Sequence, residues 1–488
     1  MATTGETACD LIFREATVID GSGAPRFVAD VAVKRDRIAA IGDFAGVTAH
    51  EVVEARGLVL APGFIDTHGH DDGAVLAMPG MEIKVSQGVT SVVNGNCGVS
   101  LAPLAIEGPP PPPVSTLGGP EDFAFPTMAA YLERLAACPP AVNTASLVGH
   151  STLRVGAMSD LKREANAEEL EVMRERLREA MAAGAIGLSS GVFYPPSQAA
   201  TIAETVELAR IAGEAGGIYT SHVRDESDAI VPSLQEAITV GAAAGAPVVI
   251  SHHKVAGVKN FGRSRETLAL LDKANATHEV GFDAYPYTAA SSWLTPDYLC
   301  LCSRVTVTWS KTYPEMKGRD IAAIAREWGC DDEEAARRLQ PGGAVYFLMD
   351  EADVRRIVSH PRAMIGSDGL PNDMHPHPRL WGTFPRVLGH YVRDEKLFGL
   401  EEAIRRMTSL PASTFGFAER GLVKHGAFAD LVLFDPDIVI DTATFEQPVQ
   451  AARGIELVLV NGVPVWRAGA STGARPGRVL RRQSMRVA

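Results

Sequence analysis

Two histidines stand two residues apart at the end of an apolar run, in Phe64-Ile-Asp-Thr-His-Gly-His70. Residues i and i+2 of an extended segment point to the same side, so His68 and His70 are placed to bind one metal ion. His222, His252 and Asp368 each follow another short apolar run. Imidazoles and a carboxylate after separate strand-like segments are the donors of a metal centre, and we expect these five residues to form one.

Cys97 follows a fifth apolar run, within Gly95-Asn-Cys-Gly98. A buried free cysteine is usually a small apolar filler, and the residues alone leave that interpretation open. Glycine and asparagine neighbours, however, give the side chain little to pack against. A thiolate combined with imidazoles is a good ligand set for Zn²⁺, so we favour Cys97 as a zinc ligand.

The segments that position these residues alternate between strand and helix. Residues 166–183 carry apolar side chains at helical spacing, with Asn166 and Glu169 suited to cap the start and Gly184 suited to end the helix. Eight strand ends follow one another, near Asp66, Asn94, Val148, Leu188, Ser221, Ser251, Asp283 and Gly366. This pattern predicts an α/β fold, a (β/α)8 barrel, in which chemistry gathers at the carboxyl ends of the strands.

Both ends of the chain differ from this middle part. Short strand patterns and turn residues fill the first sixty and the last seventy residues, and Asn461-Gly462 predicts a hairpin turn. We therefore expect a composite β domain from residues 1–62 and 417–488, and a barrel over 63–416. An inserted lid at about 288–348 accounts for the long gap before the eighth strand. The proline-rich segment 108–114 is interpreted as a loop.

Composition narrows the class of protein. The 488 residues have 46% hydrophobic and 22% charged side chains, which excludes wholesale disorder. The net charge of −13 argues against a nucleic-acid partner. No apolar run is long enough to span a membrane, no secretory signal opens the chain, and six cysteines are too few for a disulfide framework. We expect a cytoplasmic protein with a small-molecule substrate, and the oligomeric state stays open.

The chain resembles the amidohydrolase superfamily and, within it, the N-acyl-D-amino-acid deacylases. The resemblance covers nearly the whole chain and rests on specific motifs. These are Gly63-Phe-Ile-Asp-Thr-His-Gly-His-Asp-Asp72, Gly95-Asn-Cys-Gly98, Thr220-Ser-His-Val-Arg-Asp-Glu226, Ser251-His-His-Lys254, Asp283-Ala-Tyr-Pro-Tyr287, Gly366-Ser-Asp-Gly-Leu-Pro371 and His377-Pro-Arg-Leu-Trp-Gly382. It implies hydrolysis of a linear amide to a carboxylate and a free D-amino acid, and the preference for D over L rests on it alone.

The resemblance also implies a division of the metal ligands. A tightly bound Zn²⁺ would use Cys97, His222 and His252, and a second, weaker metal site would use His68, His70 and Asp368. Many members of the superfamily bridge two metals with a carboxylated lysine on strand four. This chain has Leu188-Ser-Ser-Gly191 there, which favours one essential zinc.

Substrate contacts follow from the same resemblance. Asp368 would be the catalytic base and acid. The α-carboxylate of the substrate would be bound by Lys254, Tyr285, Ser291 and Arg379. Tyr346 and Met349, and with them Cys300, would line an apolar side-chain pocket. Relatives that prefer acidic substrates have an arginine where this chain has Tyr298, so we expect neutral side chains such as those of D-Met, D-Leu and D-Phe.

Two other functions compete with this one. A cyclic amidase of the hydantoinase or dihydroorotase kind shares the barrel and the paired histidines, but normally needs the strand-four lysine. A catalytically silent scaffold with the same fold would have lost ligands, whereas this chain has the full candidate set.

Overall fold

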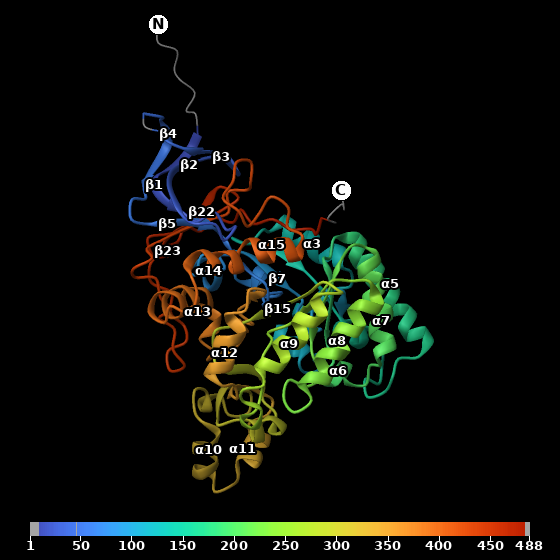
Figure 1. Ribbon diagram of the computed structural model, residues 1–488. Helices are drawn as coiled ribbons and strands as arrows, with labels where there is room; N and C mark the ends of the chain where they lie inside the picture. Colours follow the sequence, from blue (N-terminus) through green and yellow to red (C-terminus); the bar gives the residue numbers. More distant parts are fainter. Residues whose placement is uncertain (1–8, 45, 484–488) are drawn as a thin grey trace.

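The computed structural model describes residues 9–44 and 46–483. Residues 1–8, 45 and 484–488 of the expected β domain lie outside the described residues. Within them, the centre of the molecule is a ring of parallel strands surrounded by helices (Figure 1). The ring consists of β6 (Phe64–Asp66), β7 (Val89–Asn94), β10 (Asn143–Ser146) with β11 (Val148–Gly149), β12 (Gly187–Gly191), β13 (Ile218–His222), β14 (Val248–Ile250), β15 (Val280–Ala284) and β19 (Ala363–Ile365). Counting β10 and β11 as one position, the predicted (β/α)8 barrel is confirmed.

Helices link the strands and cover the outside of the ring. They are α1 (Ala74–Ala77), α2 (Glu82–Val85), α3 (Met128–Ala137), α4 (His150–Ala157), α5 (Ala167–Ala183), α6 (Pro195–Gln198), α7 (Ile202–Glu214), α8 (Ile230–Ala244), α9 (Ser264–Asn275), α12 (Glu351–Val358), α13 (Arg379–Arg386), α14 (Leu400–Met407) and α15 (Ser409–Phe415). Asn166 and Glu169 form the predicted capping box of α5, and Gly184 ends that helix with a φ of 122°. Local sequence therefore fixes the ends of this helix.

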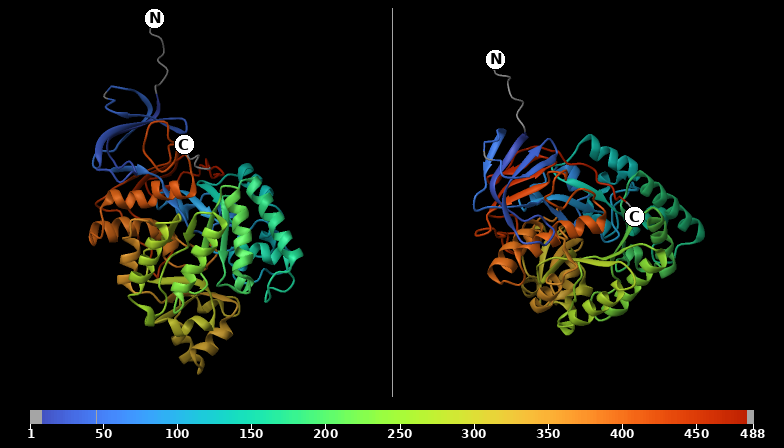
Figure 2. Two further views of the ribbon diagram at one scale, coloured as in Figure 1. Left: turned by 45° about the vertical axis from the view of Figure 1, so that its right-hand side comes forward. Right: turned by 45° about the horizontal axis from the view of Figure 1, so that its top comes forward.

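Strands from both ends of the chain form a second sheet beside the barrel (Figure 2). The N-terminal strands are β1 (Cys9–Val18), β2 (Phe27–Lys34), β3 (Arg37–Gly42), β4 (Ala49–Glu54) and β5 (Val59–Pro62). The C-terminal strands are β20 (Leu431–Phe434), β21 (Ile455–Val460), β22 (Val463–Arg467) and β23 (Ala470–Ser471). The two groups join where β5 pairs antiparallel with β20. The predicted small β domain built from both termini is confirmed.

A separate small layer follows β15 and extends away from the barrel (Figure 1). Its strands β16 (Ala289–Trp293), β17 (Arg304–Ser310) and β18 (Gly342–Phe347) form an antiparallel sheet in the order β16-β18-β17. Between β17 and β18 lie α10 (Ile321–Trp328) and α11 (Asp332–Leu339), and a 3₁₀ helix, η4 (Pro296–Leu301), precedes β17. These elements lie within the residues 288–348 that we expected to form a lid.

Apolar side chains fill one end of the barrel. Ile65, Val93, Ile218 and Val249 come from separate strands and form one buried cluster. The same cluster includes Phe415, Phe417 and Leu480 from the C-terminal part of the chain, which seal this end of the barrel. Because this end is sealed, the polar strand ends at the opposite rim are where a ligand can enter.

No helix in residues 9–44 or 46–483 combines the length and the apolar character that a membrane span needs.

Candidate metal centre and substrate cavity

A cavity of about 400 Å³ opens at the carboxyl ends of the barrel strands. The metal-ligand candidates His70, Cys97, His222, His252 and Asp368 line it, together with side chains of the small layer that follows β15. The sequence separates these residues by up to 298 positions, and the strand ends bring them together. This is the size and the place expected of a small-molecule site in such a barrel.

The loop that carries Cys97 is held in one conformation by its neighbours. Gly95 and Gly98 have φ angles of 77° and 76°. A Cβ on Gly95 would lie 2.2 Å from the carbonyl oxygen of Leu147, and one on Gly98 would lie 2.6 Å from the backbone nitrogen of Gly191. Only glycine fits such positions, which explains why the cysteine is flanked by two of them.

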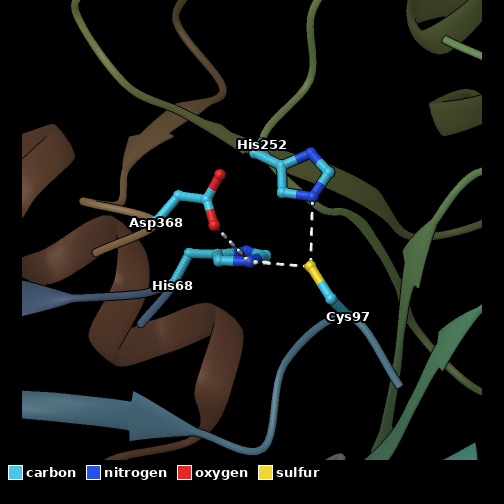
Figure 3. Close-up of side chains that lie close together, drawn as sticks. All are labelled: His68, Cys97, His252 and Asp368. Carbon is cyan, nitrogen blue, oxygen red and sulfur yellow. Dashed lines mark hydrogen bonds and ion pairs between the residues drawn. The ribbon is translucent and has the colours of Figure 1, made fainter. Parts of the chain in front are cut away.

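Cys97 lies between two imidazoles (Figure 3). Its Sγ is 3.1 Å from Nε2 of His252 and 3.2 Å from Nε2 of His68. His222 also interacts with this sulfur, and its ring centroid is 4.4 Å from that of His252. The structure thus gathers Cys97, His222 and His252, but it adds His68 to the same group.

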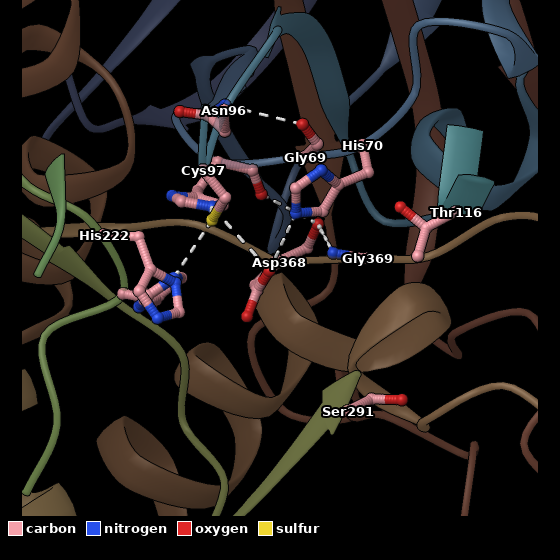
Figure 4. A network of polar contacts seen from close by, with 12 residues as sticks. Gly69, His70, Asn96, Cys97, Thr116, His222, Ser291, Asp368 and Gly369 are labelled. Carbon is pink, nitrogen blue, oxygen red and sulfur yellow. Dashed lines mark hydrogen bonds and ion pairs between the residues drawn. The ribbon is translucent and has the colours of Figure 1, made fainter. Parts of the chain in front are cut away.

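Asp368 faces His68 (Figure 3) and His70 (Figure 4). Its Oδ1 is 3.3 Å from Nε2 of His70 and 3.7 Å from Nε2 of His68. His68 therefore lies between the two ligand sets that the resemblance implied, in contact with both Cys97 and Asp368. The two sets therefore touch one another and form one continuous cluster.

Three of these residues have unusual backbone conformations. Cys97, His252 and Asp368 have φ angles of 53°, 36° and 48°. Positive φ is uncommon for residues other than glycine and costs of order 1–3 kcal/mol each. Backbone strain of this kind is commonly found at functional sites, where it fixes the direction of a side chain. Here the side chains of all three strained residues line the same cavity.

The donor set fits a zinc ion. Ligand atoms of His68, Cys97, His252 and Asp368 lie within 4.8 Å of one another. Nε2 of His222 is buried without a hydrogen-bond partner. Burial alone would raise the pKa of the Cys97 thiol, but His252 and His68 outweigh it and the pKa falls well below its usual range. Burial lowers the pKa of His222, which keeps that imidazole neutral. A thiolate and a neutral imidazole, here Cys97 and His222, are typical zinc ligands.

Glu226 lies against this centre, and sequence reasoning missed it. Its Oε1 accepts a hydrogen bond from Nζ of Lys254 at 2.6 Å and lies 3.0 Å from Nδ1 of His252. The motif Thr220-Ser-His-Val-Arg-Asp-Glu226 places it four residues after His222. This spacing indicates a residue of the site only when β13 is known to end at His222. Glu226 therefore orients His252 and pairs with Lys254.

Of the four residues expected to bind a carboxylate, Lys254 and Ser291 line the same cavity, whereas Tyr285 and Arg379 do not line it. Nη1 of Arg379 is 2.9 Å from Oδ2 of Asp368, and its guanidinium carbon lies 4.5 Å from the ring centroid of Tyr285. The hydroxyl of Tyr285 is buried without a hydrogen-bond partner. Ser291 lines the cavity, and its backbone oxygen accepts from Arg379 at 3.2 Å.

Aromatic side chains form the outer wall of the cavity. Tyr298 stacks on Phe193 with ring centroids 5.3 Å apart, and its centroid is 5.1 Å from that of Tyr346. Met349 lies elsewhere, in a separate small cavity behind Lys254 and Tyr285. Cys300 is exposed and does not line the main cavity. Sequence reasoning missed Phe193, because it lies on the loop after β12 and has no motif of its own.

One wall comes from the proline-rich segment that we had interpreted only as a loop. Pro113 of this segment lines the cavity. Thr116, two residues after the segment, also lines it and lies near His70 (Figure 4). The backbone oxygen of Thr116 accepts a hydrogen bond from the side chain of Asn372 at 3.0 Å. This segment therefore encloses the site, as loops after barrel strands commonly do.

Comparison with known proteins finds similarity along nearly the whole chain. The model of the "Amidohydrolase family" matches residues 51–331 and 316–466. D-aminoacylase of Alcaligenes xylosoxydans xylosoxydans is 53% identical over 482 residues, which is 99% of each chain. The N-acyl-D-aspartate deacylase of the same organism is 53% identical over 473 residues, 96% of this chain and 95% of its own length.

A solved structure has the same architecture. It is the N-acyl-D-glutamate deacylase from Bordetella bronchiseptica, complexed with zinc and a phosphonate inhibitor that mimics the tetrahedral intermediate of its reaction. Its TM-score to this chain is 0.94 at 47% sequence identity, covering 97% of this chain and 99% of the other.

Proposed function

The chain belongs to the amidohydrolase family, among the N-acyl-D-amino-acid deacylases, and we propose that it hydrolyses N-acyl-D-amino acids with the help of zinc. The observation that carries this proposal is the meeting of a thiolate, imidazoles and Asp368 in one cavity, beside the guanidinium of Arg379. The candidate metal ligands thus lie beside Asp368, which can move protons, and Arg379, which can bind a carboxylate.

We propose Cys97, His222 and His252 as the ligands of one tightly bound zinc, and His68, His70 and Asp368 as those of a second, weaker metal site. The contact between His68 and Cys97 supports coupling of the two, because one imidazole borders both. When bound, zinc polarises the amide carbonyl and lowers the pKa of a coordinated water towards about 7.

Asp368 moves the proton in the proposed reaction. Its carboxylate takes a proton from the attacking water and passes it to the nitrogen of the leaving amine. A C–O bond forms while the C–N bond breaks, which gives a carboxylate and a free amino acid. Burial by itself would raise the pKa of Asp368, but Arg379 and His252 hold it well below its usual range, so the group begins the cycle ionised.

Lys254, Tyr285, Ser291 and Arg379 bind the α-carboxylate of the substrate in this proposal. A guanidinium and an ammonium match the charge of a carboxylate, and hydroxyls supply further donors. In the structure each cation already has an acidic partner, Glu226 for Lys254 and Asp368 for Arg379. The substrate thus enters a site whose cations are ordered before it arrives, which lowers the entropic cost of binding.

We propose that the preferred substrates have neutral, largely apolar side chains such as those of D-Met, D-Leu and D-Phe. The aromatic wall of Phe193, Tyr298 and Tyr346 supports this choice. The chain is equally identical to a D-aminoacylase and to an N-acyl-D-aspartate deacylase, so overall identity does not distinguish between their substrates. The choice of side chain therefore rests on the residues of the pocket. Met349 lies outside the main cavity, so we propose for it only a supporting contact behind Lys254.

A cyclic amidase is the less well supported alternative. The carboxyl end of β12 carries Ser189 and Ser190, where such an enzyme would need a lysine between two metals. Each of the six cysteines is a free thiol, which supports the proposal that the enzyme works in the reducing cytoplasm.

Release of free amine from paired D and L forms of N-acetylmethionine, with and without a chelator, tests the proposal. We expect turnover of the D form, at least about a hundredfold slower turnover of the L form, and loss of both with chelator. Equal rates for the two forms, or rates that survive complete removal of metal, would contradict it.

A further inference from the structure

The barrel closes between its first and last strands, β6 and β19, and we call this contact the seam. Within residues 9–44 and 46–483, β6 and β19 share no regular ladder, and one isolated bridge joins Gly69 to Gly369 beyond their ends. By contrast, the neighbouring pairs β6–β7 and β15–β19 each have three paired residues. Other interactions must therefore hold the seam.

Side chains take the place of the missing ladder. Asp66 accepts hydrogen bonds from the backbone nitrogen of Ser367 at 2.8 Å and from its hydroxyl at 2.6 Å. The hydroxyl of Thr67 donates to the carbonyl oxygen of Ile365 at 3.0 Å. Gly366 allows the close approach, since a Cβ there would lie 2.6 Å from that of His68. Asp66 is thus the main cross-strand contact of the seam.

Lys84 completes this network from α2. Its Nζ donates to Oδ2 of Asp66 at 2.7 Å and to the hydroxyl of Ser367 at 3.0 Å, so it touches both strands. Oδ2 of Asp71 lies 3.0 Å away on a third side. Lys84, Asp66 and Asp71 are all fully buried. A buried lysine is rare and requires such partners, because an unpaired charge would be very costly there.

The seam also fixes residues of the proposed catalytic centre. His68 follows Asp66 by two residues, and Asp368 follows Ser367 directly. The backbone nitrogen of Asp368 donates to the carbonyl oxygen of His68 at 2.7 Å. The backbone nitrogen of His70 donates to the carbonyl oxygen of Gly369 at 3.2 Å. Any opening of the seam would therefore move Asp368 away from His68 and His70 (Figure 4).

We propose that Lys84 is a positioning residue of the enzyme: by holding Asp66 to Ser367 it sets the distance between Asp368 and the paired histidines. The inference rests on the proposed role of Asp368 in the reaction. Lys84 does not line the substrate cavity, so it acts only through the seam. Burial alone would lower the pKa of Lys84, but Asp66 and Asp71 outweigh it and keep the ammonium charged.

A second buried cation provides a matched control. Arg420 pairs with Asp430 and donates to the side chain of Asn461 at 2.9 Å. The carbonyl oxygen of Asp430 accepts a hydrogen bond from the backbone of Gly63, just before β6 begins. This ion pair lies at the amino end of the barrel, so its loss destabilises the fold without reaching the seam at the carboxyl end.

The test compares Lys84→Met with Arg420→Met in the zinc-loaded full chain. For Lys84→Met we expect kcat to fall about tenfold or more while KM and zinc content stay within about twofold of wild type. Amide hydrogen exchange in segments 64–72 and 363–371 should be at least about tenfold faster. Arg420→Met should lower the melting temperature but leave kcat and exchange in these segments unchanged. Lys84→Arg should restore part of the rate, because it keeps the charge.

The exchange measurement separates this inference from the proposed function. If wild type lacked deacylase activity, faster exchange in Lys84→Met would still support the seam, and wild-type exchange would overturn it. Equal loss of kcat in Arg420→Met would also overturn it. If Lys84→Met fails to fold, Ser367→Ala tests the same contact, since it removes the hydroxyl between Lys84 and Asp66. Wild-type kcat and exchange in that variant would contradict the proposal.

Discussion

The guanidinium of Arg379 lies 2.9 Å from the carboxylate of Asp368, so the residue proposed to bind the substrate touches the proposed base. Arg379 occupies Oδ2, while Oδ1 faces His70 and His68. One oxygen is thus directed to the carboxylate-binding cation and the other to the metal-ligand candidates. This arrangement couples substrate binding to the orientation of the base.

Replacing Asp368 with Asn should abolish turnover while zinc stays bound. The amide keeps the shape of the side chain but cannot accept a proton at the pKa that catalysis requires. We expect kcat to fall by about 10³-fold or more, with zinc content near that of wild type. Amine release and metal analysis of the same preparation check this. Turnover above a tenth of the wild-type rate would show that another group moves the proton.

Replacing Tyr298 with Arg should shift side-chain preference towards acidic substrates. Tyr298 stacks on Phe193 in the outer wall of the cavity, where a guanidinium would meet a second carboxylate. We expect the ratio of kcat/KM for N-acetyl-D-glutamate over N-acetyl-D-methionine to rise at least about tenfold. Tyr298→Phe serves as the control, because it keeps the ring without adding charge. An unchanged ratio in the arginine variant would place the side-chain pocket elsewhere.

Asp373 should make stability depend on pH. Burial raises its pKa to about 7, and Ser291 and Arg379 lower it only in part. Between pH 4 and 7 the folded chain keeps a proton that the unfolded aspartate releases, so this group's stabilising contribution is lost as the pH rises.

Asp373→Asn removes that titration. The stability of the variant relative to wild type should therefore increase by about 2 kcal/mol between pH 4.5 and pH 8. Urea unfolding of both proteins at the two pH values measures the change. A difference that is the same at both values would show that Asp373 titrates normally.

Truncating Leu480 should destabilise the barrel without affecting catalysis. The side chain is buried against Phe415 and Phe417 at the sealed end, away from the metal centre. Leu480→Ala should lower the free energy of unfolding by about 2–3 kcal/mol and leave kcat and KM unchanged. Urea unfolding and amine release measure the two effects. A loss of activity without a loss of stability would contradict this structural role.

Sequence patterns predicted the strand order and the convergence of polar strand ends, because buried strands and capped helices leave local signals. The capping box of Asn166 and Glu169 is such a signal. The contact between His68 and Cys97 could not be predicted this way, since it depends on backbone conformations with positive φ at Cys97 and Asp368. At Cys97 the conformation depends on how Gly95 and Gly98 pack against Leu147 and Gly191, which are distant in the sequence.

Interactions between distant segments were equally hidden. Lys84 looks like an ordinary lysine of a short helix, and only the fold shows it buried between β6 and β19. The role of Glu226 could be inferred only from the structure, which shows its carboxylate in contact with both Lys254 and His252. Met349 is the reverse case. The resemblance implied that its side chain lines the main cavity, whereas in the structure it lines a separate small cavity behind Lys254.

Zinc content of purified wild type and of Cys97→Ala tests the central claim most directly. If Cys97 is a ligand of the tight site, wild type should hold about one zinc per chain or more, and the variant should lose that tight zinc after dialysis against a weak chelator. Cys330→Ala, which changes a cysteine outside the cavity, should retain the wild-type amount. Equal zinc in Cys97→Ala and wild type, with undiminished affinity, would contradict the claim.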